Sequence, residues 1–176
     1  LEMLAFASLG AIADVVPLTG ENRVLTSFGL GRVKNSTNPG LRALIEASRL
    51  AGEKIDTEQV GFSLAPRLNA CGRMGHAREA VELFTTATGD RAMDIARNLT
   101  KLNDERRATE RRIADQAMKM AEASGMTRPD RRAIVLAHED WHPGVVGIVC
   151  SRLVDRFSRP TILMQRKDGV CGGSGR

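Results

Sequence analysis

The chain has 176 residues, of which 42% are hydrophobic, a content that supports a packed core and argues against global disorder. Its 26 lysines and arginines outnumber its 21 aspartates and glutamates, and the formal net charge of +5 permits a polyanionic partner without demonstrating one. Aromatic residues make up only 3% of the chain, so we do not expect it to bind nucleic acid mainly by stacking bases on aromatic side chains.

The chain opens on an apolar stretch, LEMLAFASLGAIADVVPL, in which Glu2 and Asp14 are the only charged residues. These two charges break the stretch well short of the length needed to span a bilayer, and no basic segment precedes it as in a signal peptide. We therefore interpret it as a core element whose packing partners lie upstream of Leu1, and we expect no membrane association.

Residues 1–88 are predicted to form several short helices. Helical spacing of apolar residues marks residues 21–33 and 76–86, and a third helix is expected over residues 39–52, since it opens on Pro and closes on Gly. Between the predicted helices at residues 39–52 and 76–86 lies FSLAPRLNACGRMG, residues 62–75, which has no helical period and is rich in Gly, Pro and Asn. We predict a loop there.

The strongest periodic signal is a single long helix over residues 90–124. Apolar residues recur at steps of three or four, no Pro or Gly interrupts them, and Gly89 and Gly125 bracket the run. Such a helix would be about 50 Å long. Its middle, NDERRATERR at residues 103–112, is charged all round, so we expect this part to cross solvent between two packed bodies.

After Gly125 the pattern changes to that of a βαβ-like unit. The apolar run at residues 133–137 predicts a buried strand, the stretch 143–157 an amphipathic helix, and PTILMQ at residues 160–165 a second strand. A third strand is expected to end in a backbone-rich loop, GGSGR, at residues 172–176. The fold class predicted is therefore α/β, with the end of one domain, a connecting helix and the start of a second domain.

Two of the segments that could carry chemistry lie in the first half of the chain. Asp14 stands between apolar neighbours, where an ionised carboxylate needs a partner or a metal, and helix capping or a buried pair remains open beside metal binding. In residues 62–75, Arg67, Asn69 and Arg73 stand among glycines that let backbone amides approach an anion, and arginine forks suit phosphate oxygens. A basic surface loop without a ligand is the alternative.

The third segment is HEDWHPGVVGIVCSRL, where His142 precedes a proline at the start of a helix. A helix amino end attracts anions, while Trp141 either shields a base or fills the core. His138 and His142 are four residues apart, but the strand-to-turn setting argues against a helical metal pair. The terminal glycine-rich loop adds backbone amides, the Ser174 hydroxyl and the Arg176 fork.

The three cysteines, Cys71, Cys150 and Cys171, are odd in number and widely spaced, with no C-x-x-C motif. This pattern fits neither a disulfide framework nor a zinc site. We expect small, buried or half-buried thiols in a reducing, cytoplasmic setting.

Five motifs along the chain resemble those of RecJ-type exonucleases, which belong to the DHH phosphoesterase superfamily. They are, in the family's order, LGAIADVVPLTGENRVL, NPGLRALIEAS, APRLNACGRMGHAREAVELFTT, DWHPGVVGIVCSRL and GGSGR. The resemblance covers essentially the whole chain. It implies the end of a DHH catalytic domain at residues 1–88, a connecting helix at 89–125 and the start of an α/β DHH-associated nucleic-acid-binding domain at 126–176.

The function that the resemblance implies is 5′-to-3′ exonuclease action on single-stranded DNA, with Mn²⁺ or Mg²⁺ in a two-metal site, in DNA repair and recombination. The partners it implies are single-stranded DNA with a 5′ end and a single-strand-binding protein or helicase. On this resemblance Asp14 is a metal ligand and, with Arg73, part of the catalytic site. Phosphate or nucleic-acid contacts are implied for a larger set: Arg67, Asn69, Arg73, His142, Arg152, Ser174 and Arg176.

The sequence departs from the family's pattern in one respect that bears on catalysis. The Asp-His-His triplet and any D-x-D pair are absent, and in the family these lie upstream of the segment resembled here. A two-metal site needs ions about 4 Å apart held by several ligands, so Asp14 alone cannot form it. We therefore expect an internal fragment that is inactive by itself. Two alternatives remain open: another DHH phosphoesterase acting on small nucleotides or pyrophosphate, and a relative that only binds.

Overall fold

The structure is a computed structural model that describes residues 2–176. The chain divides into two compact units, one up to Asn103 and the other from Asp104 to Arg176, and each is described by itself. Among the described residues, no helix combines the length and the apolarity that crossing a membrane requires.

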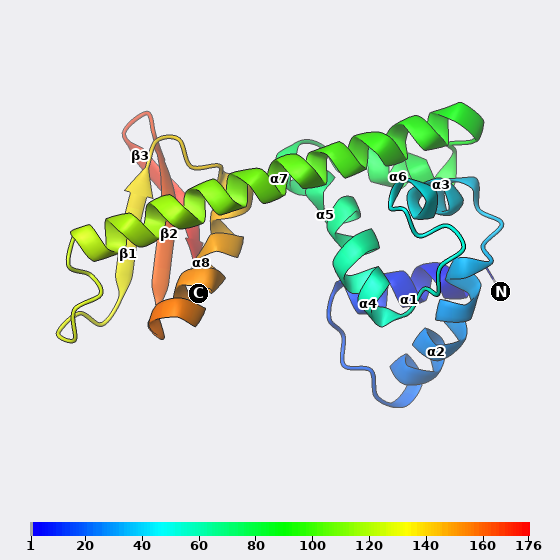
Figure 1. Ribbon diagram of the computed structural model, residues 1–176, viewed down its shortest axis with the longest axis horizontal. Helices are drawn as coiled ribbons and strands as arrows, with labels where there is room; N and C mark the ends of the chain where they lie inside the picture. Colours follow the sequence, from blue (N-terminus) through cyan, green and yellow to red (C-terminus); the bar gives the residue numbers. More distant parts are fainter. Residues whose placement is uncertain (1) are drawn as a thin grey trace. The chain divides into compact units, whose positions relative to one another are not determined.

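The described part of the first unit is helical. Its elements are α1 (Met3–Ala13), α2 (Gly20–Lys34), α3 (Pro39–Ala47), α4 (Thr57–Gln59), the π-helical η1 (Val60–Leu64), α5 (Ala65–Met74), α6 (Arg78–Thr85) and the first part of α7 (Gly89–Ala123). Within this unit α1 packs along α2, and α3 packs against α6 (Figure 1). The core is built from fully buried aliphatic side chains, among them Leu41, Leu44, Val60, Leu64, Leu83, Ile95 and Leu99.

Three helices predicted for the first unit are confirmed, one of them with an earlier end. α2 and α6 match the predictions, whereas α3 ends at Ala47, shortly before Arg49 adopts a left-handed conformation with φ of 60°. Asn38 explains why α3 begins where it does: its Oδ1 accepts from the Leu41 amide at 2.9 Å, and Pro39 follows at the first helical position. The Asn38 Nδ2 also donates to Phe84 O at 3.0 Å, which joins this cap to α6.

The prediction of a loop over residues 62–75 is wrong, because this segment is helical. η1 leads directly into α5, and Leu64, Leu68 and Cys71 follow at helical spacing toward the core. Pro66 lies in the first turn of α5, directly after the π-helical turn η1, and Gly75 caps the C-terminal end of α5. The proline and the glycines of this segment therefore do not prevent it from being helical.

α1 ends in a strained turn beside Asp14. The Val15 amide donates to Ile12 O at 3.1 Å and the Val16 amide to Ala11 O at 2.9 Å, which is the bonding pattern of a Schellman motif. Glycine usually occupies the left-handed position of this motif, but here it is Val15, with φ of 55°. A residue held in a sparsely populated backbone region costs about 1–3 kcal/mol, so the turn persists only because its surroundings fix it.

The second unit contains the C-terminal part of α7, a three-stranded sheet and α8. The strands are β1 (Ile134–His138), β2 (Thr161–Lys167) and β3 (Val170–Gly175), and α8 spans Pro143–Phe157. β1 pairs parallel with β2 and β2 antiparallel with β3, in the order β1-β2-β3. α8 connects the two parallel strands and packs on β2 and β3 (Figure 1). The predicted strand–helix–strand unit is thereby confirmed.

The sheet buries one set of its side chains more completely than the other. Ile134, Leu136 and Leu163 are buried, whereas Val135 and its register partner Ile162 are each 42% exposed. Parallel strands are usually buried on both faces. The apolar run at residues 133–137 instead forms a strand, β1, that is buried on one face only.

The loop expected at the C-terminus is instead part of β3. Residues 172–175 pair in antiparallel register with β2, and Arg176 exchanges two backbone hydrogen bonds with Thr161, at 2.9 and 3.0 Å. Gly173 fits there because it lacks a side chain, since a Cβ would come within 2.0 Å of Leu163 O. The glycines thus let β3 lie close to β2 rather than freeing a loop.

The long helix predicted over residues 90–124 is confirmed as α7, and two residues of its charged middle are buried. Asn103 and Glu110 are only 3% and 5% exposed. Charged residues on every face of a helix therefore do not show that every face is exposed to solvent, because a carboxylate can be buried when cationic side chains pair with it.

Val15→Gly is expected to raise the free energy of unfolding of the first unit by about 1 kcal/mol, because glycine relieves the strain but adds entropy to the unfolded chain. Urea unfolding followed by far-UV circular dichroism measures the change. Val24→Gly, at an exposed position inside α2, is the control and is expected to lower stability. A Val15→Gly variant no more stable than the parent would show that the turn is not strained.

Candidate functional site

Asp14 is exposed and occupies the C-cap of α1, so the alternative of a buried pair is wrong. Its backbone amide donates to Gly10 O at 3.0 Å. A carboxylate is disfavoured by about 0.3–1 kcal/mol at this end of a helix, where the dipole is negative, so its side chain is no favourable cap. Among residues 2–176 no group of three or more His, Cys, Asp or Glu side chains could hold a metal ion. Asp14 could therefore serve only as one ligand of a larger set.

α5 separates the three residues predicted to line one phosphate site. Asn69 and Arg73 are exposed and one helical turn apart, so they share a face of α5. The Arg67 Nη1 donates to Ser63 O at 2.7 Å and to Ser63 Oγ at 3.0 Å, and its Nε donates to Thr100 Oγ1 at 3.2 Å. Arg67 thus ties α5 to η1 and to α7, which is a structural task.

Next to this face, an apolar hollow of about 510 Å³ is bounded by α5 and α6. Leu68, Cys71, Val81 and Phe84 contribute to its lining, together with Asn69. Burial raises the pKa of the Cys71 thiol, which donates to Leu68 O at 2.9 Å and stays protonated. The lining suits an apolar group rather than a phosphate oxygen.

The stretch HEDWH matches the letters of H-E-x-x-H, which binds zinc when both histidines lie on one helix. Here His138 ends β1, whereas His142 caps α8. Both use Nδ1 as an acceptor, His138 from the Asp140 amide and His142 from the Gly144 amide, each at 3.1 Å. The two imidazoles are therefore engaged with backbone and do not form a helical metal pair.

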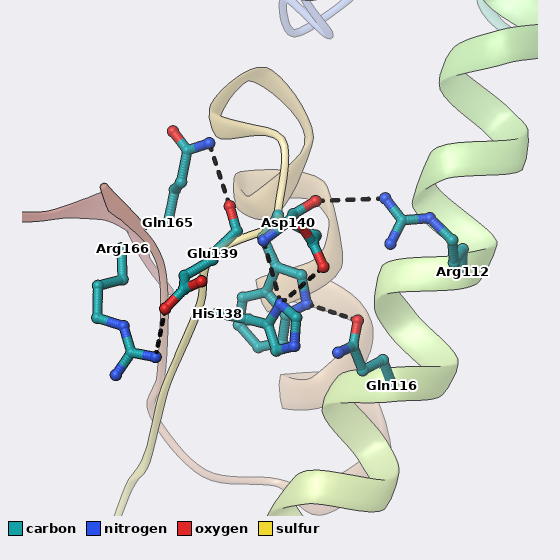
Figure 2. Close-up of polar contacts among 8 residues, drawn as sticks. Arg112, Gln116, His138, Glu139, Asp140, Gln165 and Arg166 are labelled. Atoms are coloured by element: carbon teal, nitrogen blue, oxygen red, sulfur yellow. Dashed lines mark hydrogen bonds and ion pairs between the residues drawn. The ribbon is translucent and has the colours of Figure 1, made fainter. Parts of the chain in front are cut away.

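The loop between β1 and α8 is fastened to α7 (Figure 2). Trp141 is fully buried and its Nε1 donates to Gln116 Oε1 at 3.0 Å, and Arg112 donates to Asp140 O at 3.3 Å. Of the two alternatives for Trp141, the core position is confirmed. These contacts hold the amino end of α8 in place, and with it the His142 cap.

Ser174 and Arg176 lie against the first half of α8. A Cβ on Gly147 would be 3.0 Å from the Ser174 Oγ and 3.9 Å from the Arg176 Nη2, so the missing side chain leaves room for both. The Cys150 thiol donates to Ser174 O at 3.2 Å, and burial raises its pKa. The structure thus brings together a hydroxyl, an exposed guanidinium and a helix. Cys171, expected to be at least half-buried, is exposed.

Arg152 has a partner that the sequence did not indicate. Its Nη2 is 2.7 Å from Glu110 Oε1, and the other oxygen of Glu110 is 2.9 Å from Arg106 Nη1. The Arg152 side chain remains 49% exposed. The i, i+4 spacing of Arg106 and Glu110 is a readable signal for one of these ion pairs, whereas nothing local in the sequence links Arg152 to Glu110.

No protein-family model matches the chain, but curated proteins do. It is 42% identical, over 99% of its length, to the single-stranded-DNA-specific exonuclease RecJ of Bacillus subtilis, and covers 22% of that protein. It is 36% identical to the RecJ of Escherichia coli, again over 99% of the chain and 31% of the relative. The chain thus spans roughly a fifth to a third of the length of these relatives.

Solved structures agree with this match. A crystal structure of RecJ from Thermus thermophilus in complex with Mg²⁺ superposes with a TM-score of 0.82 at 37% identity, over 93% of this chain and 25% of that one. A crystal structure of exonuclease RecJ bound to manganese gives a TM-score of 0.80 at 37% identity, over 91% of this chain and 40% of that one.

Gly147→Val is expected to destabilise the second unit by about 1–3 kcal/mol, because the new side chain would collide with Ser174. Trp141 is the only tryptophan and lies in this unit, so its fluorescence during urea unfolding reports the change. Gly31→Ala, inside α2 with nothing near its added methyl group, is expected to gain about 1 kcal/mol and is measured by circular dichroism. An unchanged midpoint for Gly147→Val would contradict the close approach.

Proposed function

Since this chain belongs to the RecJ exonuclease family, we propose that the whole protein hydrolyses single-stranded DNA and that this chain supplies part of its active site and of its DNA-binding surface. The observation that carries the proposal is the match along 99% of the chain, with the same fold over more than 90% of it. The domain assignment proposed with it is a catalytic part at residues 1–88, a connecting helix at 89–125 and a nucleic-acid-binding part at 126–176.

We propose Mn²⁺ or Mg²⁺ as the cofactor, because RecJ structures have been solved with each of these ions. Such ions stabilise charge on a reacting phosphate and activate water when bound. The exposed Asp14 carboxylate suits a hard divalent cation. The other described residues do not complete a metal site, so the remaining ligands are proposed to come from the rest of the whole protein.

The proposed phosphate contacts follow the positions of the cationic side chains. On α5, Asn69 and Arg73 share an exposed face that could meet a strand, with Arg73 proposed to act close to the chemistry. Arg67 is proposed to contribute mainly by holding α5, since Ser63 and Thr100 engage its guanidinium.

In the second unit we propose that Ser174 and Arg176 bind the terminal phosphate of a 5′ end, with Arg152 contacting the same strand. Support comes from the position of Ser174 and Arg176 beside α8, where they offer one hydroxyl group and one guanidinium group as hydrogen-bond donors. His142 is proposed to act through α8, whose first turn it caps. The 5′-to-3′ direction, a role in DNA repair and recombination, and a cytoplasmic location with a single-strand-binding protein or helicase as partner are further parts of this proposal.

In the whole protein, Asp14→Ala is expected to abolish hydrolysis while leaving DNA binding nearly intact, because a carboxylate attracts a cation but not a phosphate backbone. Release of nucleotides from 5′-phosphorylated single-stranded DNA with Mn²⁺ measures the rate, and fluorescence anisotropy measures binding. Glu21→Ala, at an exposed carboxylate in the first turn of α2, is the control and should keep the parent rate. A rate above about a tenth of the parent, a loss under about 1.4 kcal/mol, would show that Asp14 is not essential.

Arg176→Ala in the whole protein is expected to lower kcat/KM about ten- to a hundredfold on a 5′-phosphorylated end and much less on a 5′-hydroxyl end. The reason is the loss of a charge-assisted hydrogen bond, worth about 1.5–3 kcal/mol, to a group with extra negative charge. Steady-state kinetics on both ends at two salt concentrations separate the cases. Arg156→Ala, at an exposed position of α8, is the control. Equal losses on both ends would mean that Arg176 grips the strand without recognising where it begins.

A further inference from the structure

Glu110 is a buried carboxylate held between two arginines of the second unit. Its side chain is only 6% exposed, and its two oxygens are divided between Arg106 on α7 and Arg152 on α8, at 2.9 and 2.7 Å. A buried carboxylate needs a cation, and one arginine is enough to balance its charge. The second arginine leaves an excess positive charge fixed at this place.

The two arginines differ in how far they reach solvent. The Arg106 side chain is 14% exposed and stays on α7 beside Glu110, at i, i+4 spacing. The Arg152 side chain is 49% exposed. A guanidinium has five N–H donors in a rigid plane, and the closest approach of Arg152 to Glu110 is made by its Nη2. Holding one edge of this plane on a buried anchor fixes the direction in which the other donors point.

We propose that Glu110 is a positioning residue, which orients the exposed edge of Arg152 to bind a phosphate of a nucleic-acid strand. The inference deepens the proposed function and rests on it, because it assumes that the second unit contacts DNA. The anchor reduces the side-chain entropy that a flexible surface arginine loses on binding an anion. Arg106 compensates the buried charge, which leaves Arg152 available to the ligand.

This inference predicts the opposite of simple electrostatics. Removing a negative charge from a DNA-binding surface should strengthen the binding of a polyanion. Positioning predicts instead that Glu110→Gln weakens the binding of single-stranded DNA about three- to tenfold at low salt, a smaller loss than for a buried charge-assisted bond because the Arg152 side chain is half exposed. The slope of log K against log salt should fall by about 0.7, the share of one phosphate on a single strand.

The experiment measures binding of a fluorescein-labelled oligonucleotide to the 176-residue chain by anisotropy over a salt series. Asp155→Asn, which removes an exposed carboxylate of α8, is the matched control and should bind as tightly as the parent or more tightly. Arg152→Ala should reproduce both the affinity loss and the slope change of Glu110→Gln. In the Arg152→Ala background, Glu110→Gln should cause no further loss, because its effect passes through Arg152.

Glu110→Asp is the second variant, since it keeps the charge but shortens the reach, and it decides the question if Glu110→Gln does not fold. Weaker binding by this variant supports positioning, and unchanged binding overturns it. Tighter binding by Glu110→Gln also overturns the inference, while leaving the proposed function intact if Arg152→Ala and Arg176→Ala still bind more weakly. Parent-like binding by all of these variants would instead overturn the role of the second unit in DNA binding.

Discussion

The close approach of β3 to α8 on one side and to β2 on the other determines where Ser174 and Arg176 lie, and one glycine permits each approach. Gly147 on the helix leaves space for the Ser174 hydroxyl, and Gly173 on the strand lets the backbone of β3 lie close to that of β2. The Cys150 thiol then bonds to the carbonyl of Ser174, which fixes β3 from the helix side. The segment predicted as a loop from the sequence is therefore held by backbone pairing on one side and by a helix on the other.

A comparable constraint acts on Asp14 in the first unit. The hydrogen bonds from Val15 and Val16 close the end of α1 and determine the direction in which the chain leaves the helix. Valine in the left-handed region makes this turn costly, and an aspartate at the negative end of the helix adds an electrostatic cost. Two unfavourable features at adjacent residues are the kind of local conflict that proteins retain at functional sites.

Periodicity predicted most of the fold, and it failed where local composition and tertiary packing disagree. α7, α8 and the first two strands follow from apolar spacing and from prolines and glycines at their ends. α5 was missed because its glycines and proline are typical of loops, although Leu64, Leu68 and Cys71 keep a helical period into the core. The third strand was expected, but its glycine-rich end was predicted as a loop for a related reason: in β3 the glycines serve close approach between backbones, which no local rule distinguishes from flexibility.

The candidate site was predictable as a set of residue types but not as a set of neighbours. Arg67, Asn69 and Arg73 were grouped because they are close in sequence, yet a helix turns Arg67 toward Ser63 and Thr100 and leaves the other two on an exposed face. The ion pair of Arg152 joins residues from two helices far apart in the chain, so no sequence window contains it.

The same geometry explains why the arginines of this chain are not equivalent as ligands for DNA. Arg67 donates hydrogen bonds to a carbonyl and two hydroxyls. Arg152 is held by a single buried carboxylate, and about half of its side chain is exposed to solvent. Net charge brings a polyanion to both alike. The energy of a specific contact depends on donors that are both oriented and accessible. Arg152 meets both conditions, because the buried Glu110 orients its guanidinium while about half of the Arg152 side chain stays exposed to solvent.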